Sequence, residues 1–289
     1  ATCLRMGELG YISKSQDNIN IAYNNLEEYL ADLKKALTTD HPRYKTLGTK
    51  VGDEYIQLNT AIIQIENEYY SSIRPKRLVG SGERPINALR ENGIEYVEIR
   101  ALDHNIYDPF GISDETAIFL ESFLFYCLLC EDQPCDADEI IKIQNNWGKV
   151  VLSGRDENTE LQFKEGSAPL KERAIEILDA MTNFEDRIGD RGYRNIYKKS
   201  LESQRLKISD SNMTPSGKLL QDITESGLSW DEFTDQIAKS HKEEILKSKR
   251  DVDYLEEQAK KSLEEFSIKE TQKEKDFDSF LAEYLSAIE

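Results

Sequence analysis

The chain has 289 residues, of which 38% are hydrophobic and 32% are charged, and its mean hydropathy is -0.62. This length suffices for one large domain or two smaller ones with a substantial core, and the composition excludes a disordered tail. The formal charge of -18, from 55 acidic and 37 basic residues, repels phosphate backbones, so we expect no binding to nucleic acid.

Three sequence features bear on the compartment in which the protein works. The most apolar stretch, residues 116–130, falls short of the roughly 18 to 20 residues needed to cross a bilayer and contains Glu121, so it predicts a buried helix. The first residues lack the pattern of a secretory signal. The four cysteines fit a reducing compartment better than a disulfide framework: Cys3, Cys127, Cys130 and Cys135. We therefore expect a cytoplasmic protein without a membrane partner.

The first third of the chain predicts one long helix followed by two strands. In residues 18–38, apolar side chains recur three and four positions apart after a polar run suited to capping, which predicts a helix. Residues 41–55 are rich in turn-forming residues, and strand-like stretches follow at 64–77 and 93–103. The connection at 78–92 contains two glycines and a proline, and its length predicts a loop that serves a ligand.

Beyond Pro109 the sequence is mainly helical. Residues 149–165 are the exception, because they predict a short strand, KVVLSG, and a polar turn. The other segments predict helices: 114–131, 136–148, 169–187, 191–206, 214–226, 229–248 and a charged stretch that ends at residue 289.

Charged residues occupy one face of the second strand, where a core strand would carry Val or Ile. Side chains alternate along a strand, so these five share a side: Ile94, Tyr96, Glu98, Arg100 and Leu102. A carboxylate can ligate Mg²⁺, and a guanidinium matches phosphate oxygens. Glu98 and Arg100 therefore predict a site that holds a metal ion and a phosphate. A surface ion pair with a cross-strand partner remains the alternative.

The first strand predicts a second polar face. The same alternation puts these residues on one side: Glu66, Glu68, Tyr70, Arg74 and Lys76. The Tyr70 phenol could bind a substrate carboxylate or cover the sheet, and the second role is the more common one for a strand tyrosine. Pro75 indicates an edge strand or the end of a strand.

Three cysteines have the spacing C-x2-C-x4-C, which is compatible with a zinc or iron–sulfur site. Cys127 and Cys130 fall on the apolar helix, and no fourth ligand is spaced nearby. Free cysteine is among the most often buried residues, so we favour a structural role for these side chains.

Four motifs together resemble one enzyme family. Residues 1–16, 64–77, 93–103 and 145–155 are similar, in order and spacing, to the C-terminal half of proteobacterial-type glutamate–cysteine ligase. That family belongs to the glutamine synthetase-like superfamily. The resemblance implies an ATP- and Mg²⁺-dependent ligase that joins the γ-carboxylate of L-glutamate to the amine of L-cysteine through a γ-glutamyl phosphate, the first step of glutathione synthesis.

The resemblance also implies roles for individual residues. Glu98 corresponds to a metal-binding glutamate, and Arg100 to a catalytic arginine that stabilises the transferring phosphoryl group. Arg5 corresponds to a residue that binds a substrate carboxylate. The other implied substrate-binding residues are Tyr11, Tyr70 and Arg74, with Lys76 as a neighbour of the anionic substrates.

The implied fold is α+β, with an incomplete antiparallel sheet of the glutamine synthetase-like core in residues 1–110 and a mainly helical region in residues 111–289 that packs on the sheet. The upstream half of the family, which supplies further metal-binding carboxylates, is absent, so we expect a fragment that is inactive by itself. We also expect a monomer. The competing hypothesis is a non-catalytic, acidic helical scaffold, in which the two strands merely cap a bundle.

Overall fold

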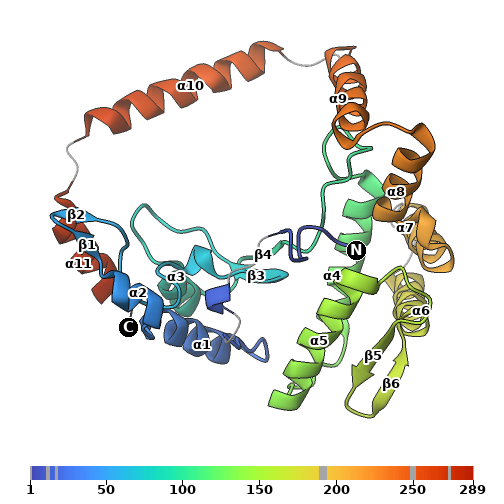
Figure 1. Cartoon of the computed structure of the whole chain (residues 1–289), viewed down its shortest axis with the longest axis horizontal. Coiled ribbons are helices and arrows are strands. Elements are labelled where there is room, and N and C mark those ends of the chain that lie inside the picture. Colours follow the sequence, from blue (N-terminus) through green and yellow to red (C-terminus); the bar gives the residue numbers. More distant parts are fainter. Residues whose placement is uncertain are drawn as a thin grey trace.

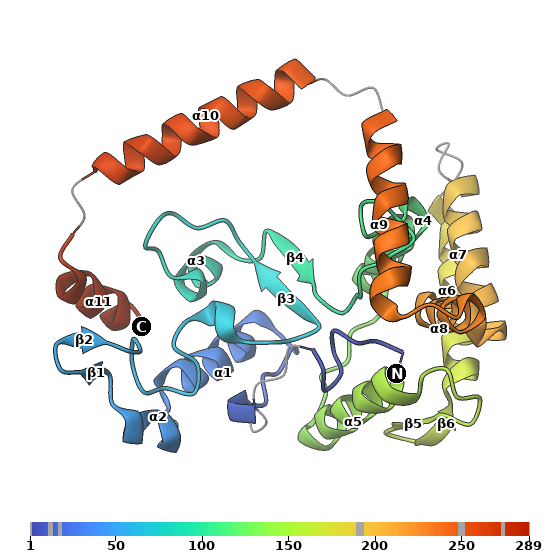
Figure 2. The ribbon, with the colours of Figure 1, turned by 45° about the horizontal axis from the view of Figure 1, so that its top comes forward.

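The computed structural model describes residues 2–10, 14–16, 19–188, 194–247, 252–272 and 275–288. The chain folds as α+β, as predicted, with small antiparallel sheets among many helices. Figures 1 and 2 show the strand pair β3–β4 near the centre, with α1, α3 and α11 on one side and α4 to α9 on the other. The candidate site therefore lies between two helical groups.

The first core forms around α1 (Leu26–Thr38). The Asn25 side chain caps this helix by accepting a hydrogen bond from the Glu28 backbone N–H, so the helix begins later than the predicted residue 18. Leu33 and Leu37 are almost fully buried and lie in one cluster with Ile86 and Leu89 of α3 (Pro85–Asn92). The prediction of a ligand loop over residues 78–92 is wrong for its second half, which is this helix.

The turn-rich stretch after α1 contains short elements. Helix α2 (Pro42–Leu47) is followed by β1 (Lys50–Val51) and β2 (Glu54–Tyr55), which pair antiparallel. Gly52 occupies the turn between these strands with φ +63°, a conformation in which glycine carries no steric cost. The phenol of Tyr55 donates a hydrogen bond to Asp278, which connects this hairpin to α11 (Phe277–Ser286).

The predicted strand pair is present but shorter than expected. Strand β3 (Ile73–Lys76) runs antiparallel to β4 (Tyr96–Ile99), with Arg74 opposite Glu98. Residues Glu66–Glu68 form a 3₁₀-helix, η2, instead of the start of a strand. The predicted alternation from Glu66 to Lys76 is therefore wrong before Ile73, because a 3₁₀-helix does not alternate its side chains.

The second part of the chain is helical around a small hairpin. Its elements, in chain order before α11, are as follows: α4 (Asp114–Leu129), α5 (Ala137–Ser153), β5 (Glu160–Phe163), β6 (Gly166–Pro169), α6 (Leu170–Ile188), α7 (Arg194–Ser209), η3 (Ser211–Met213), α8 (Pro215–Ser226), α9 (Trp230–Lys247) and α10 (Val252–Thr271). The predicted KVVLSG strand is wrong, since residues 149–153 continue α5. A capping box of Asp136 and Glu139 starts that helix.

Helix α4 is less buried than the sequence predicts. Phe119, Phe123 and Tyr126 pack against buried side chains of α6 and α7. The opposite side of the helix is solvent-exposed, and Leu128 is 76% exposed. Cys127 and Cys130 are also exposed free thiols, so α4 does not bury them. The prediction of a buried helix holds for one face only.

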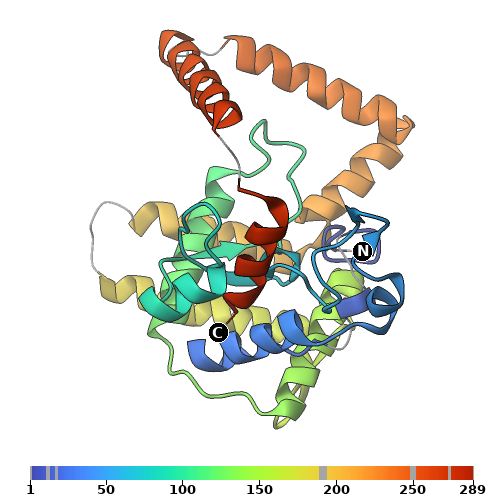
Figure 3. The ribbon, with the colours of Figure 1, turned by 90° about the vertical axis from the view of Figure 1, so that its left-hand side faces the viewer.

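The C-terminal helix returns to the first core. Arg84 Nη1 donates a hydrogen bond to the Tyr284 carbonyl at 3.1 Å, and Asn87 Nδ2 donates to the Ala287 carbonyl at 2.6 Å. Figure 3 shows α11, in red, beside α1 and α3. Helix α10 lies apart from these elements in Figures 1 and 2, and none of its described residues is buried. The division of the chain at residue 110 stays a prediction.

Of the helices that the structure describes, none combines the length and the apolar character needed to cross a membrane.

Candidate active site on the β3–β4 strand pair

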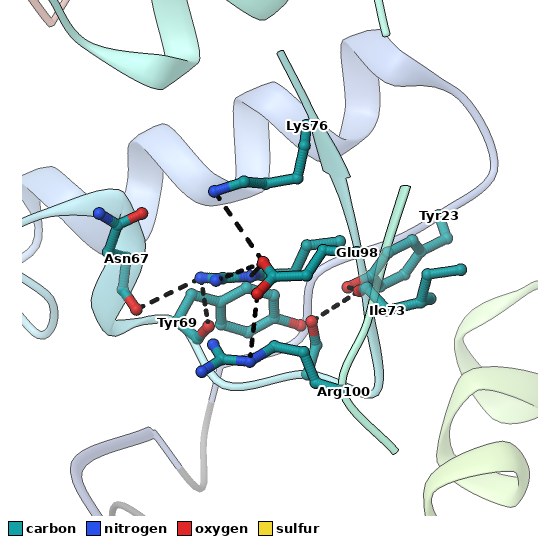
Figure 4. Close-up of polar contacts among 9 residues, drawn as sticks. Tyr23, Asn67, Tyr69, Ile73, Lys76, Glu98 and Arg100 are labelled. Carbon is teal, nitrogen blue, oxygen red and sulfur yellow. Dashed lines mark hydrogen bonds and ion pairs between the residues drawn. The ribbon is translucent and has the colours of Figure 1, made fainter. Parts of the chain in front are cut away.

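A buried guanidinium holds Glu98 from the neighbouring strand. Arg74 donates to Glu98 Oε2 from Nη2 at 2.7 Å and from Nε at 3.2 Å. Figure 4 shows Glu98 between Lys76 and Arg100. Its Nη1 donates to the carbonyls of Asn67 and Tyr69. Four of the five Arg74 N–H groups thus have protein partners. Arg74 is only 6% exposed, so this arrangement fixes the Glu98 carboxylate relative to the β3–β4 pair.

Two further cations flank the same carboxylate. Lys76 Nζ lies 3.9 Å from Glu98 Oε2, and Arg100 Nε lies 3.7 Å from Oε1. Partial burial raises the pKa of Glu98, but the hydrogen bonds and charge of Arg74, together with Arg100 and Lys76, outweigh burial and hold that pKa below its ordinary value. The carboxylate is therefore ionised at neutral pH and surrounded by positive charge.

Arg100 retains hydrogen-bonding capacity beside Glu98. Its Nη1 is buried and makes no hydrogen bond to any residue that the structure describes. Its guanidinium carbon lies 5.4 Å from the centre of the Tyr70 ring, within the range of a cation–π contact. A cross-strand ion pair accounts for Arg74 and Glu98, but it leaves this Arg100 nitrogen unexplained. A buried donor without an acceptor suits an anion that binds there.

A polar pocket of about 350 Å³ adjoins Tyr70. Gln16, Gln64 and Glu68 also line it. Gln16 accepts a hydrogen bond from the Tyr70 backbone N–H at 3.1 Å and donates to the Glu68 carbonyl at 2.6 Å. Amide and carboxylate groups of this kind can bind the amine and carboxylate of an amino acid. Local pattern does not predict this role for Gln16, because Gln16 lies 54 residues from Tyr70 along the chain.

The N-terminal segment lies next to the end of β4. Asp103 accepts hydrogen bonds from the backbone N–H groups of Leu4 and Arg5, both at 2.7 Å. These bonds tie the Arg5 backbone to the chain just beyond Arg100. Tyr11 lies outside the described residues. The structure thus brings together Tyr70, Arg74, Lys76, Glu98 and Arg100.

Glu98 is the candidate for a metal ligand. Its Oε1 lies beyond hydrogen-bonding distance of Arg100 Nε, so this oxygen keeps lone pairs for a cation. Over the described ranges, no three His, Cys, Asp or Glu side chains are grouped closely enough to hold a metal ion. Mg²⁺ commonly binds through one or two carboxylates plus substrate phosphates and water. Glu98 therefore fits the role of one protein ligand in a site that other groups complete.

Comparison with known proteins identifies the family. The family model described as glutamate-cysteine ligase matches residues 1–150, which is just over half of the chain. The chain belongs to the glutamate–cysteine ligase family. Glutamate–cysteine ligase of Pseudomonas fluorescens is 38% identical over 291 residues, covering 100% of this chain and 55% of the relative. That of Alcanivorax borkumensis is 39% identical, covering 98% and 56%.

Solved structures of similar proteins agree with this membership. Glutamate–cysteine ligase of Francisella tularensis in complex with AMP superposes with a TM-score of 0.88 at 31% identity, covering 98% of this chain and 56% of that one. A bifunctional glutathione synthetase of Pasteurella multocida has a TM-score of 0.58 at 18% identity and shares the fold. The chain thus spans about half the length of its family relatives, and residues 5 to 100, which hold every predicted site residue, lie inside the matched region.

Proposed function

We propose that this chain carries part of the active site of a glutamate–cysteine ligase. The reaction joins the γ-carboxylate of L-glutamate to the amine of L-cysteine, with ATP as the phosphoryl donor and Mg²⁺ as the metal, and begins glutathione synthesis. The observation that carries the proposal is the Arg74–Glu98–Arg100 cluster, which lies within the segment that the family model matches. In this cluster, Arg100 Nη1 is buried and has no acceptor among the described residues.

Arg100 is the residue assigned to the phosphoryl group. During transfer of the γ-phosphoryl group to the glutamate carboxylate, negative charge spreads over the oxygens of the phosphoryl group. A preorganised guanidinium stabilises that charge. The Arg100 Nη1 donor meets this requirement because it is already desolvated and needs no other bond to be broken. The cysteine amine then displaces phosphate from the γ-glutamyl phosphate.

Glu98 would ligate Mg²⁺ through Oε1 while Arg74 holds Oε2. The metal, when bound, neutralises ATP phosphates. Arg74 serves in this proposal as a positioning residue, since its contacts go to Glu98 and two backbone carbonyls. Its predicted contact with a substrate stays a prediction.

The amino-acid substrates are assigned to the pocket beside Tyr70. Its amide and carboxylate side chains supply donors and acceptors for an α-amino acid, and Tyr70 bridges this pocket to Arg100. Arg5 and Tyr11 remain predicted contacts for the substrate carboxylate and for the cysteine portion. We also infer a cytoplasmic protein, on the basis of four free cysteines. The monomeric state stays a prediction.

A chimera tests the proposed function. The unmatched part of the Pseudomonas fluorescens relative is joined upstream of this chain, and ADP release is measured with ATP, Mg²⁺, glutamate and cysteine. We expect no turnover by the chain alone, turnover by the chimera only when both amino acids are present, and loss of turnover in Glu98→Gln. Glu91→Gln, an exposed carboxylate on α3, is the control that keeps activity.

Three results would each contradict a part of the proposal. A chimera that is folded by circular dichroism and releases no ADP with both amino acids present would refute the assigned reaction. Turnover by the 289-residue chain alone would refute the expected inactivity of the isolated piece. Full activity of the Glu98→Gln chimera would favour the scaffold hypothesis for the strand pair.

A further inference from the structure

A second pocket lies away from the strand pair, among α4, α6 and α7. It has a volume of about 380 Å³ and is mainly apolar. Phe119 and Phe123 of α4 form one wall, with ring centres 6.0 Å apart and planes inclined by 20°. Ile177 and Leu178 of α6 and Ile208 of α7 also line it. Figure 2 shows α6 and α7 side by side, distant from β3–β4.

This hollow is a gap in the apolar cluster of α4, α6 and α7, and it opens to solvent. Leu178 is 3% exposed and belongs to the core cluster, whereas Ile177 is 40% exposed at the rim. Protein interiors are close-packed, and an unfilled apolar space of this size loses dispersion contacts along its lining. Ligand pockets in proteins span about 300 to 1,000 Å³ and are lined mainly by apolar groups with a few polar ones. The space therefore has the size and lining of a site for a small ligand.

A lysine supplies the polar group. Lys207 lines the pocket, and its Nζ donates to Oε1 of Gln204, another lining residue, at 3.2 Å. Among the described residues, Lys207 forms no ion pair; the other lining lysine, Lys171, pairs with Glu157 at 2.9 Å. Desolvation by burial lowers the pKa of Lys207, and the charge of Glu115 opposes this only in part. An ammonium group with spare donors in an apolar setting favours an anionic ligand.

We propose that the α4–α6–α7 pocket binds a small monocarboxylate with an apolar chain or ring, whose carboxylate meets Lys207 and whose apolar part fills the space against Phe119 and Phe123. This site is separate from the proposed ligase site and does not depend on it. The charge of the lysine selects an anion over an amine, and the lining selects an apolar body over a polar one.

Calorimetry with matched probes on the 289-residue chain tests this site. Octanoate, octanol and octylamine share one hydrocarbon chain and differ in charge. We expect octanoate to bind at one site per chain, octanol to bind about tenfold more weakly, and octylamine to give no measurable heat. Acetate, which has the charge without the chain, is expected not to bind.

Two variants locate the binding. Lys207→Met keeps an unbranched side chain and removes the charge, so octanoate affinity is expected to fall about tenfold, to the level of octanol. Ala174→Phe places a ring into the pocket from α6 and is expected to block octanoate and octanol alike. Lys239→Met, which removes an exposed lysine of α9, should leave the affinity unchanged.

The proposal fails on three outcomes. Absence of octanoate binding refutes it, as does equal binding of octanoate and octylamine. Octanoate binding that survives both Lys207→Met and Ala174→Phe shows that the ligand lies elsewhere. Because Ala174→Phe could disturb α6, circular dichroism and urea unfolding are measured on each variant, and Lys207→Met gives an independent result if Ala174→Phe does not fold.

Discussion

Arg84 and Glu66 form a bidentate ion pair inside the first core. Nε and Nη2 of Arg84 each lie 3.0 Å from an oxygen of Glu66, and the two side chains are 0% and 5% exposed. The same guanidinium lies 4.2 Å from the centre of the Tyr284 ring. One side chain at the start of α3 thus connects η2, α3 and α11.

Loss of this arginine is expected to destabilise the fold. Arg84→Met leaves Glu66 charged, buried and without its partner, which costs about 3–5 kcal/mol of unfolding free energy. Urea denaturation followed by circular dichroism measures the change. Arg173→Met is the control, because the Arg173–Glu176 pair is exposed and such pairs contribute about 0–1 kcal/mol. Equal effects of the two substitutions would show that the buried pair does not hold the core together.

The Glu98 cluster predicts a pH-dependent contribution to stability. The folded-state pKa of Glu98 lies below its ordinary value of 4.5, so its ion pairs stabilise the fold above that pH and lose this effect as pH falls through the folded-state pKa. The difference in unfolding free energy between wild type and Glu98→Gln should therefore shrink between pH 7 and pH 3. Urea titrations at each pH measure it. If the difference grew on acidification, its pH dependence would be opposite to the expected one and would contradict the assigned ion pairs.

Substitution of Arg100 separates catalysis from stability. Arg100→Ala removes the donor assigned to the phosphoryl group, and we expect kcat of the chimera to fall at least about 100-fold. The free energy of unfolding should change by less than about 1 kcal/mol, because the ion pair between Arg100 and Glu98 is long. Arg43→Ala, on the exposed surface of α2, is the control for loss of a cation. Unchanged kcat in Arg100→Ala would remove this residue from the catalytic role.

The start of α1 depends on one side chain. Asn25 Oδ1 accepts a hydrogen bond from the Glu28 backbone N–H at 2.9 Å, so Asn25→Ala should lower the unfolding free energy by about 1 kcal/mol. Asn25→Ser, which keeps an oxygen acceptor, should recover most of that loss. Thermal unfolding compares the three proteins. A serine variant as unstable as the alanine variant would indicate that Asn25 acts through other contacts.

Local sequence patterns predicted much of this architecture. The helical periodicities after Pro109 and the strands around Arg74 and Glu98 are present because apolar spacing and alternation are local properties. The 3₁₀-turn at Glu66 was missed because its partner, Arg84, lies 18 residues further along the chain. KVVLSG stays helical although it contains two adjacent valines: Val151 is buried, and its carbonyl accepts a hydrogen bond from Thr2 at 2.7 Å.

In the candidate site, too, local sequence patterns predict some features and miss those that depend on distant residues. Alternation along the predicted strand at 93–103 puts Glu98 and Arg100 on one face, and these two side chains lie together in the structure, although β4 ends at Ile99. Alternation could not reveal that Asn67 and Tyr69 carbonyls fix Arg74, or that Gln16 borders Tyr70, because these contacts follow from the tertiary path of the chain. The motif predicts the position of the candidate site, whereas the groups that orient Glu98 follow from the tertiary structure.

Helix α10 is an exposed connection between two parts of the chain that are each held in place by other contacts. Both helices that it joins are anchored elsewhere: α9 contacts α8, while α11 is held by Arg84 and Asn87. A single cut by a protease within α10 should consequently yield two polypeptides that still co-migrate as one native particle and separate only in denaturant. The same geometry makes this helix a natural place to open the chain for new termini.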